Sequence, residues 1–157
     1  MRSIYPYILV CLLFTGCKKS EITPPQNDLN LLLQKINSLR QSGCNCGTEF
    51  MPPVAPLSSN TLLDNAATAH AIDMVQRSYF DHVSPDGNTP EERAKLAGYT
   101  GNVKAENLGK GYVNSDQVIS AWKNSTSHCK VMMDPNSKEA GVGFNRNYWV
   151  AVFGNPL

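Results

Sequence analysis

The sequence Tyr79-Phe80-Asp81-His82-Val83-Ser84-Pro85-Asp86-Gly87 places a histidine directly ahead of a tight turn. The proline presets the backbone φ angle, the next aspartate can hydrogen-bond its own backbone, and the glycine accepts a positive φ. The imidazole of His82 is therefore expected to be held in a defined position. Two later stretches are predicted to meet it: Ala105-Glu106-Asn107-Leu108-Gly109 and Ser125-Thr126-Ser127-His128-Cys129.

The composition indicates one soluble globular domain. The chain has 157 residues, of which 41% are hydrophobic and 17% charged, and this length suffices for one core and hardly for two. The formal net charge is +1, and no run of five like charges occurs. A nucleic-acid-binding protein of this size would normally carry a basic stripe, so no nucleic-acid partner is expected. We expect a monomer.

The first 16 residues are predicted to be a signal peptide rather than part of the fold. Ile8 to Phe14 is an apolar run that is too short to span a bilayer comfortably as a helix. Thr15-Gly16-Cys17 then resembles a bacterial lipoprotein cleavage site, at which Cys17 would become the lipidated first residue. The alternative is an ordinary signal peptide that leaves Cys17 free. Residues 17–27 are polar and contain two prolines, so we expect a flexible tether ahead of a domain at 28–157.

Of the five cysteines, Cys11 would leave with the signal peptide and Cys17 would carry the lipid, so three remain for the domain: Cys44, Cys46 and Cys129. An exported domain can keep disulfides. Cys44 and Cys46 are separated by one residue and would form a strained pair with each other. We therefore expect Cys129 to pair with one of them and to leave one thiol free. The rival interpretation is a metal site built from the three cysteines and His128.

Hydrophobic spacing predicts two helices in the first half of the domain. The first begins at an Asp28 cap and ends at Gly43, after which residues 44–56 are expected to form a long loop stiffened by prolines. The second runs from about Asn60 to Ser78. The apolar stripe of the first helix consists of Leu29, Leu32, Ile36 and Leu39.

The second half predicts two more helices and then strands. The third helix starts at the capping box Thr89-Pro90-Glu91-Glu92, and the fourth at a Ser115 cap. Helices come first and clear strands last, which favours an α+β layered domain. The other expected elements are a short strand at 102–105, a turn at 125–127 and a hairpin of strands at 140–144 and 148–153. The stretch at 107–111 is rich in glycine but lacks the Lys-Ser/Thr ending of a phosphate-binding loop, so nucleotide binding is not expected.

His70 lies on the predicted buried stripe of the second helix, together with Leu63, Ala66 and Met74. A histidine in such a position is more often a core residue bonded to a neighbour than a ligand. We therefore expect a structural role for His70, with a role in the site as the alternative.

The order and spacing of several short motifs carry a family resemblance. They are Ala69-His70-Ala71-Ile72-Asp73-Met74, Tyr79 to Gly87, Ala97-Gly98-Tyr99, Glu106-Asn107-Leu108, Trp122, Ser127-His128, Gly141-Val142-Gly143 and Tyr148-Trp149. Together they resemble the CAP superfamily (cysteine-rich secretory, antigen 5 and pathogenesis-related proteins), in its bacterial branch. CAP domains fold as a three-layer α-β-α sandwich around a central antiparallel sheet, so the resemblance implies that fold here.

The resemblance also implies a cleft with a defined set of side chains. CAP domains hold two histidines and two glutamates there, and the matching positions are His82, Glu106 and His128. The fourth, a glutamate three residues after the tryptophan in many members, is Ser125 in this chain. Some CAP proteins bind a divalent metal between the two histidines. Zinc at His82 and His128 is therefore one use of the cleft that the resemblance implies.

Two alternative functions follow. We expect an extracytoplasmic lipoprotein that is anchored to a bacterial membrane and acts as a binding module of the cell envelope. Its expected ligand is a lipid or another envelope molecule, and no enzymatic activity is expected. His82, Glu106 and His128 would then satisfy one another in a buried polar network or position the ligand. The alternative is a metal-dependent envelope hydrolase that uses the same three residues, with water at an open zinc position.

Overall fold

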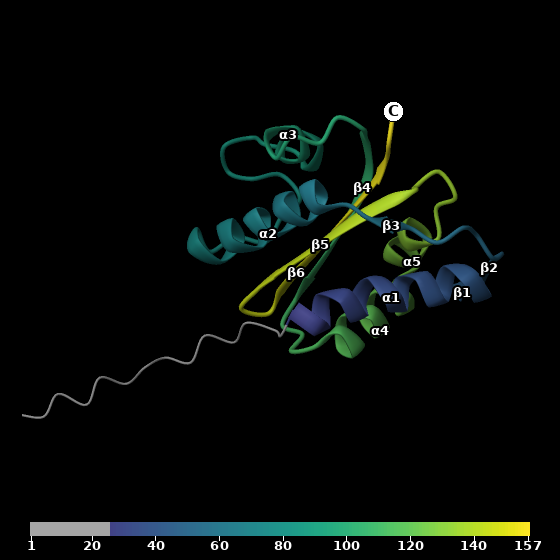
Figure 1. Cartoon of the computed structure of the whole chain (residues 1–157). Coiled ribbons are helices and arrows are strands. Elements are labelled where there is room, and N and C mark those ends of the chain that lie inside the picture. Colours follow the sequence, from purple (N-terminus) through teal and green to yellow (C-terminus); the bar gives the residue numbers. More distant parts are fainter. Residues whose placement is uncertain (1–25) are drawn as a thin grey trace, which may run out of the picture.

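The computed structural model describes residues 26–157, and Figure 1 shows the arrangement of the elements in this range. In chain order they are α1 (Gln26–Ser42), β1 (Cys44–Cys46), β2 (Glu49–Met51), β3 (Ser58–Ser59), α2 (Thr61–Gln76), α3 (Pro90–Leu96), β4 (Asn102–Lys110), α4 (Ser115–Asn124), α5 (Thr126–Met132), β5 (Glu139–Asn145) and β6 (Tyr148–Asn155).

The central sheet has four strands in the order β3-β5-β6-β4. β4 and β5 both pair antiparallel with β6, whereas the two-residue β3 pairs parallel with β5. β5 and β6 form the predicted hairpin, whose turn residues Arg146 and Asn147 have φ angles of +44° and +70°. Positive φ at both central residues is what a tight hairpin turn requires. The sheet is therefore antiparallel, as expected, apart from its short edge strand.

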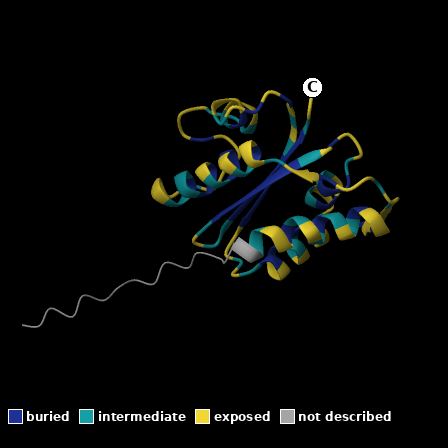
Figure 2. Cartoon of the chain, in the orientation of Figure 1, coloured by how far each residue is buried: buried dark blue, intermediate teal, exposed yellow. Residues whose placement is uncertain are grey.

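Helices cover both faces of this sheet and give three α-β-α layers (Figure 1). α2 and α3 lie on one face, and α1, α4 and α5 lie on the other. Trp149, Ala151 and Phe153 of β6 pack with α1 and α4, whereas Val150 and Val152 pack with α2. Successive strand residues point to opposite faces, so one buried strand supplies both cores. Figure 2 shows the sheet buried between helices whose outer surfaces are exposed.

Two glycines of β5 allow α2 to lie directly on the sheet. A Cβ atom at Gly141 would lie 2.1 Å from the carbonyl carbon of Leu63, and one at Gly143 would lie 2.3 Å from the backbone nitrogen of Thr68. No larger residue could occupy either position without moving the helix. This packing sets the position of α2, whose C-terminal end leads into the segment that carries His82.

Several element boundaries differ from those predicted. The expected loop at 44–56 contains an antiparallel hairpin of β1 and β2. The glycine-rich stretch at 107–111 is largely strand, because β4 pairs with β6 from residue 102 to residue 110. The expected turn at 125–127 instead opens α5, so His128 lies on a helix. Pairing with a distant strand overrides local composition in the second case.

Two predicted helix starts were wrong, by three residues for α1 and by one residue for α4. α1 begins at Gln26, so residues 26 and 27 are helical rather than part of the tether. α4 is capped by Asn114, whose Oδ1 accepts a hydrogen bond of 3.0 Å from the backbone of Gln117. The residues predicted as caps contact each other instead, since Ser115 Oγ donates to Asp28 Oδ1 at 3.1 Å. This bond joins the beginning of α1 to the beginning of α4.

The buried guanidinium of Arg40, at the end of α1, was not anticipated from the sequence. Its side chain is fully buried and donates to four backbone carbonyl oxygens, of Ala55 at 2.8 Å, Met132 at 2.7 Å, Asp134 at 2.9 Å and Ser137 at 3.1 Å. The planar guanidinium has five N–H donors, so one side chain can hold several irregular segments. Arg40 thus joins the end of α1 to the segment ahead of β3 and to the chain between the end of α5 and β5.

The predicted signal peptide at 1–16, the lipidation site Cys17 and residues 17–25 of the predicted tether lie outside the described residues. Among the helices of residues 26–157, none combines the length and the apolar character needed to cross a membrane.

Candidate functional site

Glu106 is the central residue of the candidate site. It lies on β4, its side chain is 1% exposed, and both of its carboxylate oxygens are hydrogen-bonded. His82 Nδ1 donates to Oε1 at 2.9 Å, and Arg93 Nη2 donates to Oε2 at 2.8 Å. A buried carboxylate between a guanidinium and an imidazole is compensated both in charge and in hydrogen bonding.

Arg93 also fixes the loop that carries His82. Its Nη1 donates to the carbonyl oxygens of His82 at 2.9 Å and Asn88 at 2.8 Å. Within the loop, the backbone N–H of Gly87 donates to the Ser84 carbonyl at 2.8 Å, and Gly87 has the positive φ (+86°) expected of the turn. The sequence interpretation missed Arg93. Its position directly after the capping box places Arg93 on α3, but nothing near it in the sequence indicates its bond to Glu106.

The side chain of His82 is 50% exposed, so one edge of its ring faces solvent while Nδ1 faces Glu106. The hydrogen bond to Glu106 raises the pKa of His82, and this effect outweighs the opposing effect of partial burial. The imidazolium form of His82 is therefore stabilised by Glu106, and the remaining ring nitrogen, Nε2, is free of that hydrogen bond.

His70 is fully buried and lies behind the pair formed by His82 and Glu106. Its Nε2 donates to the carbonyl oxygen of Asp81 at 3.0 Å and is 4.0 Å from Glu106 Oε1. Tyr79 Oη lies 3.3 Å from His70 Nδ1 and donates to Asp73 Oδ2. Burial lowers the pKa of His70, so the neutral ring is favoured. These contacts are those of a core histidine that supports the loop ahead of His82.

His128 lies on α5 and is partly buried. Burial lowers the pKa of His128, and the nearby His82 lowers it further. The Asn107 amide donates to the His128 backbone carbonyl at 3.0 Å, which ties α5 to β4. His82 and His128 are thus close enough to interact electrostatically, and their pKa values are shifted in opposite directions.

The available donors fit a zinc centre poorly. Both Glu106 oxygens are engaged by His82 and Arg93, and Ser125 Oγ lies 3.2 Å from the hydroxyl of Ser127. Zinc sites in proteins use three or four protein ligands. Within residues 26–157, three potential metal ligands come within 4.8 Å of one another at Cys44, Cys46 and Cys129. Among the same residues, the histidine cleft does not bring three such ligand atoms so close together. His82 Nε2 and His128 would supply two ligands.

Comparison with known proteins identifies the family to which the chain belongs. Residues 33–153 match the family described as "CAP: Cysteine-rich secretory protein family". The chain belongs to this family. The CAP domain is also similar to an extracellular protein with an SCP domain from Bacillus anthracis (TM-score 0.72, 19% identity, 82% of this chain and 40% of that one) and to an outer surface protein of Borrelia burgdorferi (TM-score 0.72, 23% identity, 84% and 95%). These two likenesses support the fold.

Two curated relatives are more similar in sequence over shorter segments. The uncharacterized protein YkwD of Bacillus subtilis (strain 168) is 36% identical over 100 residues, which cover 62% of this chain and 39% of YkwD. The uncharacterized membrane protein YlbC of the same organism is 29% identical over 87 residues, or 55% of this chain and 25% of YlbC. The CAP domain described here therefore matches less than half of either relative.

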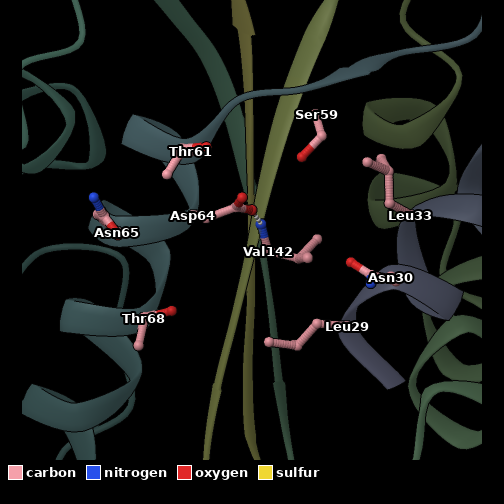
Figure 3. A pocket seen from close by; sticks show the side chains of 9 residues that line it. All are labelled: Leu29, Asn30, Leu33, Ser59, Thr61, Asp64, Asn65, Thr68 and Val142. Carbon is pink, nitrogen blue, oxygen red and sulfur yellow. Dashed lines mark hydrogen bonds between the residues drawn. The ribbon is translucent and has the colours of Figure 1, made fainter. Parts of the chain in front are cut away.

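A separate pocket of about 260 Å³ lies between α1 and α2 over β5 (Figure 3). Leu29 and Leu33 of α1 form its apolar side, and Thr61, Asn65 and Thr68 of α2 form a polar side. At the bottom of the pocket, Asp64 Oδ1 accepts a hydrogen bond of 2.7 Å from the backbone N–H of Val142. This pocket of the CAP domain shares no lining residue with the histidine cleft.

Replacing Glu106 by glutamine should lower the pKa of His82, because the neutral amide cannot stabilise the imidazolium as the hydrogen-bonded carboxylate does. The stabilisation from this bond is fully present below the unfolded-state pKa of about 6.5 and is lost as the pH rises through the folded-state pKa. An NMR titration of the imidazole protons measures the shift. Glu91→Gln removes an exposed carboxylate of α3 and should leave the His82 pKa unchanged. An equal His82 pKa in wild type and Glu106→Gln would contradict the assignment.

Proposed function

We propose that this CAP domain is an extracytoplasmic binding module, held at a bacterial membrane by a lipid on Cys17, and that it binds a cell-envelope ligand at the exposed edge of the histidine cleft. One observation carries the proposal: both oxygens of the Glu106 carboxylate are already bonded, to His82 and Arg93. A carboxylate in this state positions a histidine and is not free to activate water.

The surface beside His82 supports a binding role. Phe80 is 43% exposed and Val83 is 44% exposed, although both are apolar. The Phe80 ring meets Tyr148 edge-on with centroids 6.0 Å apart, and the Lys110 ammonium lies 4.9 Å from the Tyr148 centroid. Phe80, Tyr148 and Lys110 thus form one aromatic and cationic cluster, and Phe80 precedes His82 by two residues in the chain. This combination suits a ligand with both apolar and anionic parts, such as an envelope lipid.

The metal-dependent hydrolase is the weaker alternative. It needs a third protein ligand and a general base in addition to His82 and His128. Glu106 could fill one of these roles only by giving up a bond to His82 or Arg93, and Ser125 has no carboxylate where many CAP domains have one. The donor set therefore favours binding over hydrolysis.

Co-sedimentation tests the binding role directly. The full chain with Cys17→Ser, which cannot be lipidated, should sediment with vesicles of anionic phospholipid or with purified cell-wall fragments. A Phe80→Ala, His82→Ala variant should lose this binding, whereas Leu96→Ala, which changes an exposed apolar residue on α3, should retain it. Equal sedimentation of all three proteins, or none with either probe, would contradict the proposal.

Lipidation at Cys17 is a separate prediction. In a host that processes lipoproteins, the wild-type chain should partition with membranes and carry the lipid on Cys17 at its mature N-terminus. Cys17→Ala should give no lipid-modified protein. Mass spectrometry of the mature N-terminal peptide decides the question, and a mature N-terminus at any other residue would contradict the prediction.

Zinc binding should be weak and dependent on pH. His82 and His128 must both be neutral to bind metal, and the raised pKa of His82 extends proton competition above its ordinary value of about 6.5. Calorimetry with zinc at about pH 7.5, above that ordinary histidine value, compares wild type with His82→Ala. Sub-micromolar binding at one site per chain that is abolished by the substitution would favour the hydrolase.

A further inference from the structure

Three cysteine sulfurs meet on the side of the molecule where the β1–β2 hairpin contacts α5. Cys46 and Cys129 form a disulfide, which is one of the two pairings expected from the sequence. The third cysteine, Cys44, is a buried free thiol whose Sγ lies 3.7 Å from Cys129 Sγ. All three sulfurs lie within 4.8 Å of one another. Cys129 therefore has two neighbouring sulfurs and is bonded to one of them.

Strand geometry explains why both sulfurs reach Cys129. Cys44 and Cys46 are two residues apart in β1, so their side chains point to the same side of the hairpin. The residue between them, Asn45, is exposed on the opposite side. Leu39, Met51, Val54 and Met133 pack around the three cysteines. β1 thus presents two equivalent partners to α5 in apolar surroundings.

We propose that Cys44 exchanges with the Cys46–Cys129 disulfide, so that the chain interconverts between two disulfide isomers. The Cys44 thiolate attacks Cys129 Sγ, a Cys44–Cys129 bond forms and the Cys46–Cys129 bond breaks. The electron pair of the broken bond leaves with Cys46, which then takes up the proton that Cys44 released. One disulfide and one thiol are present before and after the step, so no external oxidant or reductant is needed.

The short distance carries this proposal. At 3.7 Å the attacking and attacked sulfurs are already in van der Waals contact. Burial raises the pKa of the Cys44 thiol, an effect that the positive charge of Lys123 partly offsets. Only the thiolate form of Cys44 can attack, and the raised pKa keeps the fraction of thiolate small. The exchange is therefore slow, and each isomer persists long enough to be trapped.

The consequence concerns the segment that carries His128. Cys129 directly follows His128 on α5, and either disulfide ties α5 to the same hairpin. Modification of Cys44 or Cys46 alone leaves the other available to Cys129. Cys129 is the shared partner, so its loss removes both connections.

Trapping experiments on the full chain test the exchange. The wild-type protein is exported in a bacterial host, purified, kept overnight in mildly alkaline buffer and then denatured in acid, which stops further exchange. N-ethylmaleimide labels the free thiols under these denaturing conditions, and non-reducing peptide mapping locates the label. Cys46→Ser and Cys44→Ser variants are mapped in the same way, with Cys129→Ser as the control that has no shared partner.

We expect wild type to carry label on Cys46 as well as Cys44, Cys46→Ser to contain a Cys44–Cys129 disulfide, and Cys44→Ser to retain Cys46–Cys129 with neither cysteine labelled. Label on Cys44 alone in wild type would overturn the proposal, whatever the variants show. Free Cys44 and Cys129 thiols in a folded Cys46→Ser protein would also overturn it. If Cys46→Ser fails to fold, the wild-type label distribution decides alone.

Discussion

Arg40→Ala should lower the free energy of unfolding by about 4 kcal/mol, because it leaves buried backbone carbonyls without donors and removes a large side chain from the interior. The guanidinium supplies hydrogen bonds to Ala55, Met132, Asp134 and Ser137. Three of these carbonyls lie in irregular segments and the fourth belongs to the last residue of α5, so no further turn of helix or strand supplies a replacement donor. Urea denaturation followed by circular dichroism measures the effect.

Two matched variants separate the contributions at Arg40. Arg40→Lys keeps a positive charge but cannot reach four acceptors with one planar group, so it should recover only part of the stability. Gln34→Ala makes the same kind of truncation at an exposed position of α1 and should be close to neutral. An Arg40→Ala protein as stable as Gln34→Ala would show that the carbonyl network contributes little.

Cys129→Ala should also lower the free energy of unfolding by about 4 kcal/mol in non-reducing buffer. The Cys46–Cys129 disulfide joins residues 83 positions apart, and the loss of so long a cross-link greatly increases the conformational freedom of the unfolded chain. Guanidinium denaturation of wild type and variant, with and without dithiothreitol, measures the difference. Reduction should lower the stability of wild type toward that of Cys129→Ala.

The other two cysteines provide the controls for this prediction. Cys44→Ala leaves the disulfide intact and should lose far less stability than Cys129→Ala. Cys46→Ala should fall between them, because Cys44 can replace Cys46 as the partner of Cys129. If reduction leaves wild type unchanged while Cys129→Ala is destabilised, the effect would come from core packing and not from the cross-link.

Locally determined features could be predicted from the sequence. The capping box of α3 needs only Thr89 and Glu92, one helical turn apart, and the structure contains it. The buried stripe of α2 follows from helical periodicity, so the burial of His70 was predictable even though its bond to Asp81 was not. The α+β class and the C-terminal hairpin likewise depend on patterns within short segments.

Features that depend on distant partners could not be predicted in this way. The sequence predicted a strand only at 102–105, but pairing with β6 extends β4 to residue 110 through the glycine-rich stretch. Nothing near Arg93 or Arg40 in sequence shows that one bonds Glu106 and the other bonds four carbonyls. The partners of these side chains are brought together only by folding.

The cysteines and the histidine cleft combine features that the sequence predicted with features that depend on folding. Residue types and their spacing were enough to predict the family, the fold class and the two candidate partners of Cys129. Folding was needed to establish that Cys46 holds the bond while Cys44 lies 3.7 Å from Cys129, and that Glu106 is shared between His82 and Arg93. Cys44 and Cys46 are two residues apart in a strand, so both side chains point to the same side. Their positions in the sequence therefore do not determine which sulfur comes within bonding distance of Cys129 when α5 packs against the hairpin.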